Sequence, residues 1–160
     1  MAKVITLKQP WAQLVVTGWK QFETRGWRTD YTGELFIHSS LTFSMSDMEL
    51  ALTEPFKTCL GNPHMMRRGF ILGSVMLEYC MPVEELKPVL ELRGTLGKHE
   101  LAFGDYSAGR WAWKLSGPKL FKVPVFAKGS LSIWDYPGRD IIDKEVYEQL
   151  TIEQRLKLVA

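Results

Sequence analysis

The stretch Gly18-Trp-Lys-Gln-Phe-Glu-Thr-Arg-Gly-Trp27 decides how this sequence is interpreted, because it concentrates charged and aromatic side chains where a helix ends and a strand begins. Alternation over residues 20–28 predicts an extended strand. Successive side chains of a strand point to opposite faces, so Glu23, Arg25 and Trp27 share one face. A face with two charges and an indole is not a core face unless it lines a polar cavity.

Two interpretations of this face remain open. In the first, Glu23 and Arg25 form a surface ion pair of little energetic weight. In the second, the face lines a ligand pocket. Lys20 and Arg25 would then hold an anionic or carbonyl group, Glu23 would accept hydrogen bonds from an amine, and Trp27 would stack on a ring. Lys20 could also serve as a base, and Glu23 could activate a water.

Over the whole chain, the sequence predicts six or seven short strands, including the one just described. Their predicted ranges are 3–7, 20–28, 33–39, 70–80, 110–115, 122–126 and 129–134. A parallel α/β order would need strands that alternate with helices throughout, whereas the last strands of this chain are bunched together. The pattern therefore favours an α+β fold, a small mixed or antiparallel β-barrel with two to three helices packed at its ends.

Helices are predicted in three places. Pro10 suits a first turn, and Gly18 is well placed to end that helix. Residues 46–49 (SDME) form a capping-box pattern that opens a helix to about Leu60, and residues 151–154 (TIEQ) form a second one before a short terminal helix. Residues 82–108 hold several helix breakers and predict a long, partly helical excursion.

Length and composition indicate one ordinary globular domain over residues 1–160. The net charge of +2 is too weak for nonspecific coating of nucleic acid, so any positive patch must be local. Cys59 and Cys80 predict two buried thiols in a reducing compartment rather than a disulfide framework. Without an apolar signal segment or an 18-residue apolar window, we expect a cytoplasmic protein away from the membrane.

A second candidate site is the segment 103–110, FGDYSAGR. Its two glycines let backbone N–H groups approach a ligand closely. Asp105 could accept from a base amino group, Tyr106 could stack, and Arg110 could meet a phosphate. The alternative is a turn that packs on the sheet, with Asp105 capping its own backbone.

His38 and Ser39, at the end of a predicted strand, either hydrogen-bond to the backbone or read a base or phosphate. The histidines are scattered along the chain and Asp105 has no neighbouring carboxylate, so no metal site and no cofactor is predicted. Most of the six tryptophans are expected in the core or the scaffold.

Several motifs, in order, resemble the ASCH domain family over residues 4 to about 135, with residues 136–160 as an extension. They are Gln9-Pro10-Trp11-Ala12, Gly18-x-Lys20-x-x-Glu23-x-Arg25-x-Trp27, Tyr31-x-Gly33, Ile37-His38-Ser39, Gly73, Phe103-Gly104-Asp105-Tyr106, Gly109-Arg110-Trp111-Ala112-Trp113 and Leu131-x-Ile133-Trp134-Asp135.

This resemblance implies a PUA-like barrel with a cleft beside the helix that carries the Gly-x-Lys motif. It also implies a link to RNA, transcription coactivation and modified nucleosides, and small bacterial relatives hydrolyse N4-acetylcytidine. The relatives' Lys and Arg match Lys20 and Arg25. Their Thr, three residues after the Lys, is replaced by Glu23, and Thr24 points to the other strand face. Their remote Glu has no obvious counterpart, and Glu78 is a candidate by chemistry alone.

Three function classes follow for this chain. The first is a cleft that binds RNA, a nucleotide or a modified nucleoside without changing it. The second is a metal-independent amidohydrolase for N4-acylated cytidine-type nucleosides, with Lys20 as base or activator. The third is a protein-interaction module that uses the helix near residues 46–59. The sequence leaves the oligomeric state open.

Overall fold

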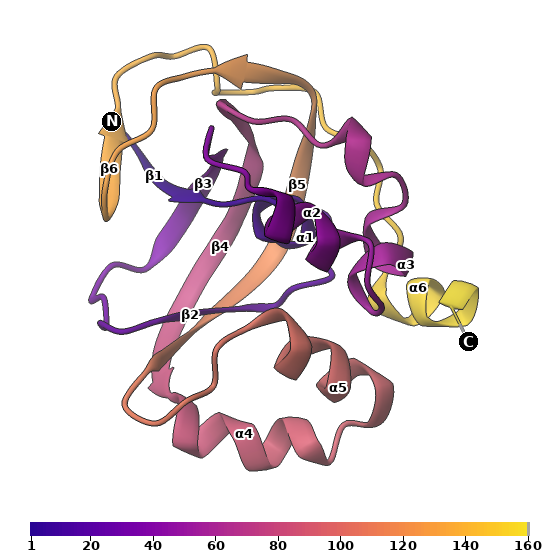
Figure 1. Ribbon diagram of the computed structural model, residues 1–160. Coiled ribbons are helices and arrows are strands. Elements are labelled where there is room, and N and C mark those ends of the chain that lie inside the picture. The colour runs from indigo at the N-terminus through magenta and orange to yellow at the C-terminus, as the bar shows by residue number, and fades with distance from the viewer. Residues whose placement is uncertain (160) are drawn as a thin grey trace.

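The computed structural model describes residues 1–159, which form an α+β fold around one six-stranded mixed sheet (Figure 1). The strand order is β2-β5-β4-β3-β1-β6. β1 and β3 pair in parallel, and every other neighbouring pair is antiparallel. The strands are β1 (Ala2–Leu7), β2 (Phe22–Arg25), β3 (Gly33–Ser39), β4 (Phe70–Pro82), β5 (Trp111–Phe126) and β6 (Ile133–Tyr136).

The helices lie at the edges and on one face of this sheet. They are α1 (Trp11–Val16), α2 (Met45–Ala51), α3 (Phe56–Leu60), the 3₁₀ turn η1 (Pro63–Met65), α4 (Val83–Glu91), α5 (Gly94–Phe103) and α6 (Ile152–Val159). Figure 1 shows α4 and α5 together at the end of the sheet that β2 crosses. None of the helices in residues 1–159 has the length and apolar character needed to span a bilayer.

The predicted α+β class and mixed sheet are confirmed, but closure into a barrel is not shown. Within residues 1–159 no ladder joins β2 to β6, the two outer strands. β2 has only four residues, so it covers only the first part of the long strand β5. The other part of that edge meets the C-terminal segment, where Phe121 bridges Val146.

Two predicted strands, 110–115 and 122–126, are one 16-residue strand in the structure, β5. The intervening residues 116–121 belong to the same strand. The ladder between β4 and β5 absorbs the irregular residues in register shifts, which lie between Ile71 and Gly73 and at two further points. The last predicted strand, 129–134, is displaced to the short β6.

The predicted helix from 46 to about 60 is wrong in its start and its continuity. Ser44, not Ser46, caps α2, because its Oγ accepts from the backbone N–H of Asp47 at 3.1 Å. Pro55 then separates α2 from α3. The excursion over 82–108 contains two helices, α4 and α5. The second capping box is confirmed, since Thr151 and Gln154 hydrogen-bond reciprocally.

Both faces of the sheet carry apolar cores. Residues such as Ile5, Ile37 and Trp113 pack under α1 on one face. Val4, Phe36 and other residues pack on the opposite face with Ile141, which comes from the C-terminal segment. A third cluster holds α4 against β2 and β5. This third contact places the end of α5 beside β2, which positions the site described below.

β5 passes close against the backbone of Gly73 in β4. A Cβ atom built there would lie 1.8 Å from the carbonyl oxygen of Lys119. Gly73→Ala is therefore expected to lower the free energy of unfolding by about 2–4 kcal/mol in urea titrations, because the backbones must move apart. Gly26→Ala is the matched control, since its nearest neighbour lies 4.0 Å away. Equal stability of the two variants would contradict this account.

Candidate ligand-binding cleft

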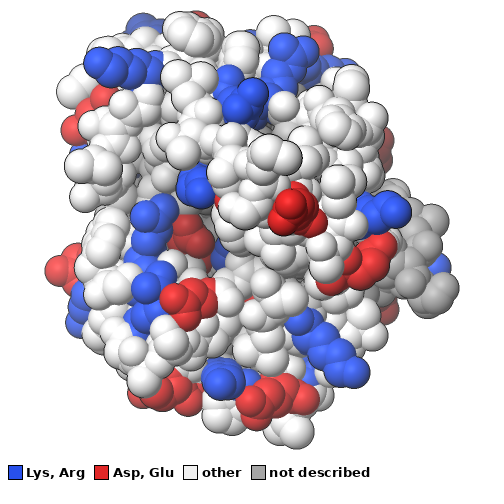
Figure 2. All heavy atoms as spheres, viewed as in Figure 1, with Lys and Arg blue, Asp and Glu red and all other residues white. Residues whose placement is uncertain are grey.

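A cleft of about 470 Å³ opens where β1 ends, β2 passes and α5 leads into the loop before β5. Figure 2 shows this face of the molecule hollowed between its upper and lower parts, with basic and acidic side chains together in the hollow. Sites for one small ligand commonly have volumes of roughly 300–1,000 Å³. The cleft is lined by Thr6, Leu7, Lys8, Trp11, Glu23, Thr24, Arg25, Ala102, Phe103, Gly104, Asp105 and Arg110.

Glu23 is the fixed carboxylate of this cleft. Its Oε2 lies 3.3 Å from the guanidinium of Arg25, and its Oε1 lies 3.4 Å from Nζ of Lys20. Oε1 also accepts from the backbone N–H of Thr24 at 3.2 Å. Only 12% of the Glu23 side chain is exposed, so the carboxylate is held at the cleft wall in one orientation.

Lys20 lies behind Glu23 rather than in the open cleft. Its side chain is completely buried, and Nζ donates to the carbonyl oxygen of Phe22. A buried ammonium is tolerated only with an opposite charge and hydrogen-bond acceptors close by. Lys20 therefore orients Glu23 from the protein side, while Arg25, with 28% of its side chain exposed, meets the cleft directly.

A second carboxylate, Glu100 of α5, faces the same buried group. Glu100 is 1% exposed, and its Oε1 accepts from the backbone N–H of Gln21. Its other oxygen, Oε2, is buried without a hydrogen-bond partner among the described residues. Burial raises the pKa of Glu100 to about 7, although the charge of Lys20 opposes this shift.

The loop after α5 is fastened to β2 through Thr24. The hydroxyl of Thr24 accepts from the backbone N–H of Asp105 at 3.0 Å, and its carbonyl oxygen accepts from Arg110 at 3.0 Å. A side chain at Gly104 would press on both Thr24 and the ring of Tyr106. Backbone and side-chain contacts thus hold Arg110 at the cleft margin, opposite Arg25.

Residues 5–124 match the ASCH domain family, which is three quarters of the chain. The chain belongs to the ASCH domain family. No curated protein matches significantly. The chain is similar to crystal structures of an ASCH protein from Zymomonas mobilis, at 15% identity with a TM-score of 0.48 over 99% of this chain and 93% of that one. A mutant of that protein matches at 16% identity and a TM-score of 0.48, over 99% and 96%.

Within this ASCH domain, four of the predicted site residues line the cleft together: Glu23, Arg25, Asp105 and Arg110. Asp105 is exposed, and its Oδ1 accepts from the backbone and the hydroxyl of Ser107, which is the self-capping turn anticipated as an alternative. Arg110 lies 3.6 Å from its other oxygen. Hydrogen bonds to Ser107 lower the pKa of Asp105, so it stays ionised.

Tyr106 and Trp27 stand apart from the cleft lining. The hydroxyl of Tyr106 is buried without a partner in the described part of the chain, and burial together with Glu100 raises its pKa. Trp27 lies beyond the end of β2, 38% exposed, with its ring edge-on to Trp113 at 4.8 Å. Its side chain therefore does not line the cleft, where it was predicted to stack on a ligand.

His38 and Ser39 are buried at the end of β3 with their polar atoms occupied. Nε2 of His38 lies 2.6 Å from the carbonyl oxygen of Ala127, and Nδ1 lies 3.2 Å from Oγ1 of Thr6. Burial lowers the pKa of His38, so the ring is neutral near pH 7. The hydroxyl of Ser39 donates to the carbonyl oxygen of Phe70 at 3.2 Å. Through these hydrogen bonds, both side chains connect β3 to neighbouring segments of the chain.

Glu100 is the site residue that the sequence did not reveal. It lies in a segment without a clear helical period, and nothing near it in sequence marks it as the partner of Lys20. Glu78, the earlier candidate, is exposed on β4 and does not line the cleft. Over residues 1–159 no three His, Cys, Asp or Glu side chains gather as a metal site.

The buried carboxyl of Glu100 predicts a pH-dependent stability. Because its folded pKa is about 7 and an exposed glutamate titrates at 4.5, the folded state holds the proton between these values. The stabilising contribution is full below pH 4.5 and is lost as the pH rises through about 7. Glu100→Gln should remove this loss and gain up to about 3 kcal/mol over the wild type by about pH 8.

Urea unfolding of wild type and Glu100→Gln near pH 5 and near pH 8 measures this difference. Glu91→Gln, an exposed carboxylate on α4, is the control and should follow the wild type at both pH values. Parallel pH profiles for wild type and Glu100→Gln would show that Glu100 is ionised throughout.

Proposed function

We propose that this ASCH domain binds a single nucleotide, a modified nucleoside or a short single-stranded RNA segment in the cleft. The observation that carries the proposal is Glu23, held between Lys20 and Arg25 at the cleft wall. A fixed carboxylate is the natural acceptor for an exocyclic amino group of a base. The cations around it suit a carbonyl oxygen or a phosphate of the same ligand.

The distribution of charge supports a small or single-stranded ligand over a duplex. Lys8, Arg25 and Arg110 line the cleft, whereas Glu23 and Asp105 share its walls. Three cations partly neutralised by two carboxylates offer few phosphate contacts, and duplex binding depends on many. Trp11 and Phe103 add apolar surface on which a base can lie.

Arg25 and Arg28 form a matched pair for testing this proposal. Arg25 lines the cleft, whereas Arg28 is 61% exposed, pairs with Asp30 and lies outside it. We expect wild type to bind cytidine 5′-monophosphate or a short single-stranded RNA in isothermal titration at low salt. Arg25→Ala should weaken binding by about tenfold to a hundredfold, because one charge-assisted contact is worth roughly 1.5–3 kcal/mol. Arg28→Ala should bind like wild type.

Equal loss in both variants would indicate a general charge effect instead of a cleft. Absence of binding by any of these probes at millimolar concentration would overturn the proposal. Urea unfolding of each variant shows whether the cleft itself survives the substitution.

A second candidate function, hydrolysis of an N4-acylated cytidine-type nucleoside, is favoured by the carboxylate of Glu23 beside the guanidinium of Arg25 at the cleft wall. Glu100, buried with a pKa of about 7, does not line the cleft, so it supports the site from behind. Glu23 would take a proton from water while the water oxygen bonds to the acyl carbon, and Arg25 would stabilise the oxyanion. As the carbon–nitrogen bond breaks, the proton passes from Glu23 to the amine, which leaves cytidine and a carboxylic acid.

In this scheme Lys20 and Glu100 are positioning residues, because both are buried behind Glu23. A mass-spectrometric time course with N4-acetylcytidine tests the reaction. Wild type should release cytidine, while Lys20→Ala and Glu23→Gln should lose at least about a hundredfold in rate, the usual contribution of a general base. Glu23→Gln is needed because Lys20→Ala leaves buried carboxylates unpaired.

Turnover that survives Glu23→Gln would reject the role of Glu23 as base. If wild type at substrate-level concentration leaves N4-acetylcytidine intact, the hydrolase is excluded. The binding proposal would be unaffected by either result, since it depends on affinity alone.

A further inference from the structure

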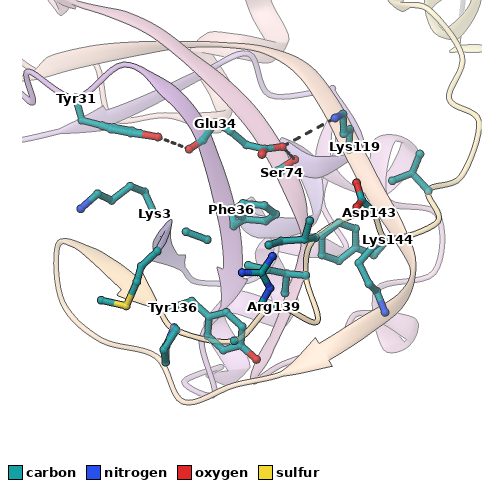
Figure 3. Close-up of a pocket in the computed structure, with 18 residues that line it drawn as sticks. Lys3, Tyr31, Glu34, Phe36, Ser74, Lys119, Tyr136, Arg139, Asp143 and Lys144 are labelled. Carbon is teal, nitrogen blue, oxygen red and sulfur yellow. Dashed lines mark hydrogen bonds and ion pairs between the residues drawn. The ribbon is translucent and has the colours of Figure 1, made fainter.

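A second pocket, of about 690 Å³, lies at the other end of β1 (Figure 3). Residues 1–3 line this pocket, whereas residues 6–8 line the cleft, and no residue lines both. Its floor is apolar, made by Phe36, Phe121 and Ile141, which all belong to one buried cluster. The two sites are therefore separate in space and can be tested separately.

The segment over residues 137–146 builds one wall of this pocket. It follows β6 and returns to β5, where the backbone N–H of Lys122 donates to the carbonyl oxygen of Glu145 at 2.9 Å. The backbone N–H of Tyr147 donates to the carbonyl oxygen of Leu120 at 2.9 Å. This wall lies beyond residue 124, where the match to the ASCH family ends, so the family match does not account for the pocket.

Four basic residues line the pocket, and two of them are without an acidic partner in the described chain. Lys3 pairs with Asp135 at 2.8 Å, and Lys119 lies 3.9 Å from Glu34. Arg139 and Lys144 make no ion pair or side-chain hydrogen bond with residues 1–159, and Nζ of Lys144 lies 6.0 Å from the Phe121 ring centre. Figure 3 shows the side chain of Arg139 toward the middle of the pocket.

Glu34 supplies an acceptor on the facing wall. Its Oε2 accepts from the hydroxyl of Ser74 at 2.9 Å, and its carbonyl oxygen accepts from the hydroxyl of Tyr31. Figure 3 places Glu34, Ser74 and Lys119 along one side of the pocket. The second acidic residue of the lining, Asp143, lies on the same segment as Arg139 and Lys144.

We propose that this pocket binds a small aromatic phosphate of the nucleoside monophosphate class. The ring would lie against the apolar floor of Phe36 and Phe121, and an exocyclic amino group would donate to Glu34. Arg139 and Lys144 would hold the phosphate, for which a guanidinium and an ammonium without partners are suited. A bare anion would leave the apolar floor uncovered, and an uncharged nucleoside would leave both cations without a partner.

Adenosine 5′-monophosphate is the probe for this pocket. In methyl NMR spectra it is expected to shift the signals of Ala2 and Ile141, which line the pocket. Adenosine alone and inorganic phosphate alone should each bind at least about tenfold more weakly, because each satisfies only part of the site. Arg25→Ala, in the cleft, should leave this binding unchanged.

The double variant Arg139→Ala/Lys144→Ala is expected to weaken adenosine 5′-monophosphate at least about tenfold through loss of both phosphate contacts. The control Arg93→Ala/Lys57→Ala removes the same charge types from exposed positions outside the pocket and should bind like wild type. The proposal is overturned if the pocket methyl signals do not move at millimolar probe. It is equally overturned if the double variant binds like wild type, or if phosphate alone binds as tightly as the nucleotide.

Discussion

The completely buried ammonium of Lys20 is the constraint on which the arrangement of this ASCH domain depends. Such a charge is stable in the interior only if opposite charge and acceptors come to it, since its desolvation costs several kcal/mol. The carbonyl of Phe22 and the carboxylate of Glu23 come from β2, and Glu100 comes from α5. One buried lysine therefore fixes the end of α1, the start of β2 and the position of α5.

This constraint explains why a carboxylate, Glu23, stands beside Lys20. A hydroxyl cannot neutralise the Lys20 ammonium, and the other nearby carboxyl, Glu100, has its pKa raised to about 7 by burial. Glu23 provides the missing negative charge and turns it toward the cleft. The hydroxyl of the adjacent Thr24 is used on the other side of the strand, where it accepts from the backbone N–H of Asp105.

Features that depend on adjacent residues could be predicted from the sequence, whereas features that depend on contacts between distant segments could not. Strand alternation placed Glu23 and Arg25 on one face correctly, and the Thr151–Gln154 box was found because capping involves four adjacent residues. The missing barrel closure and the single strand β5 depend on ladders between distant segments, and the register shifts in these ladders follow no local sequence pattern. Glu100 lies about eighty residues from Lys20 in the sequence, yet it accepts from the backbone N–H of Gln21 next to that lysine. No local sequence pattern predicts this contact.

The two pockets differ in how their charges are used, and that difference bears on selectivity. In the cleft, Arg25 and Arg110 already lie 3.3 and 3.6 Å from carboxylates. The affinity for a ligand there must therefore come mainly from well-aligned hydrogen bonds. In the second pocket, Arg139 and Lys144 have no such partners in the described chain, so attraction over distance contributes more. Salt screens exposed charges, with a Debye length near 10 Å at 0.1 M. Binding in the pocket should accordingly respond to ionic strength more steeply than binding in the cleft.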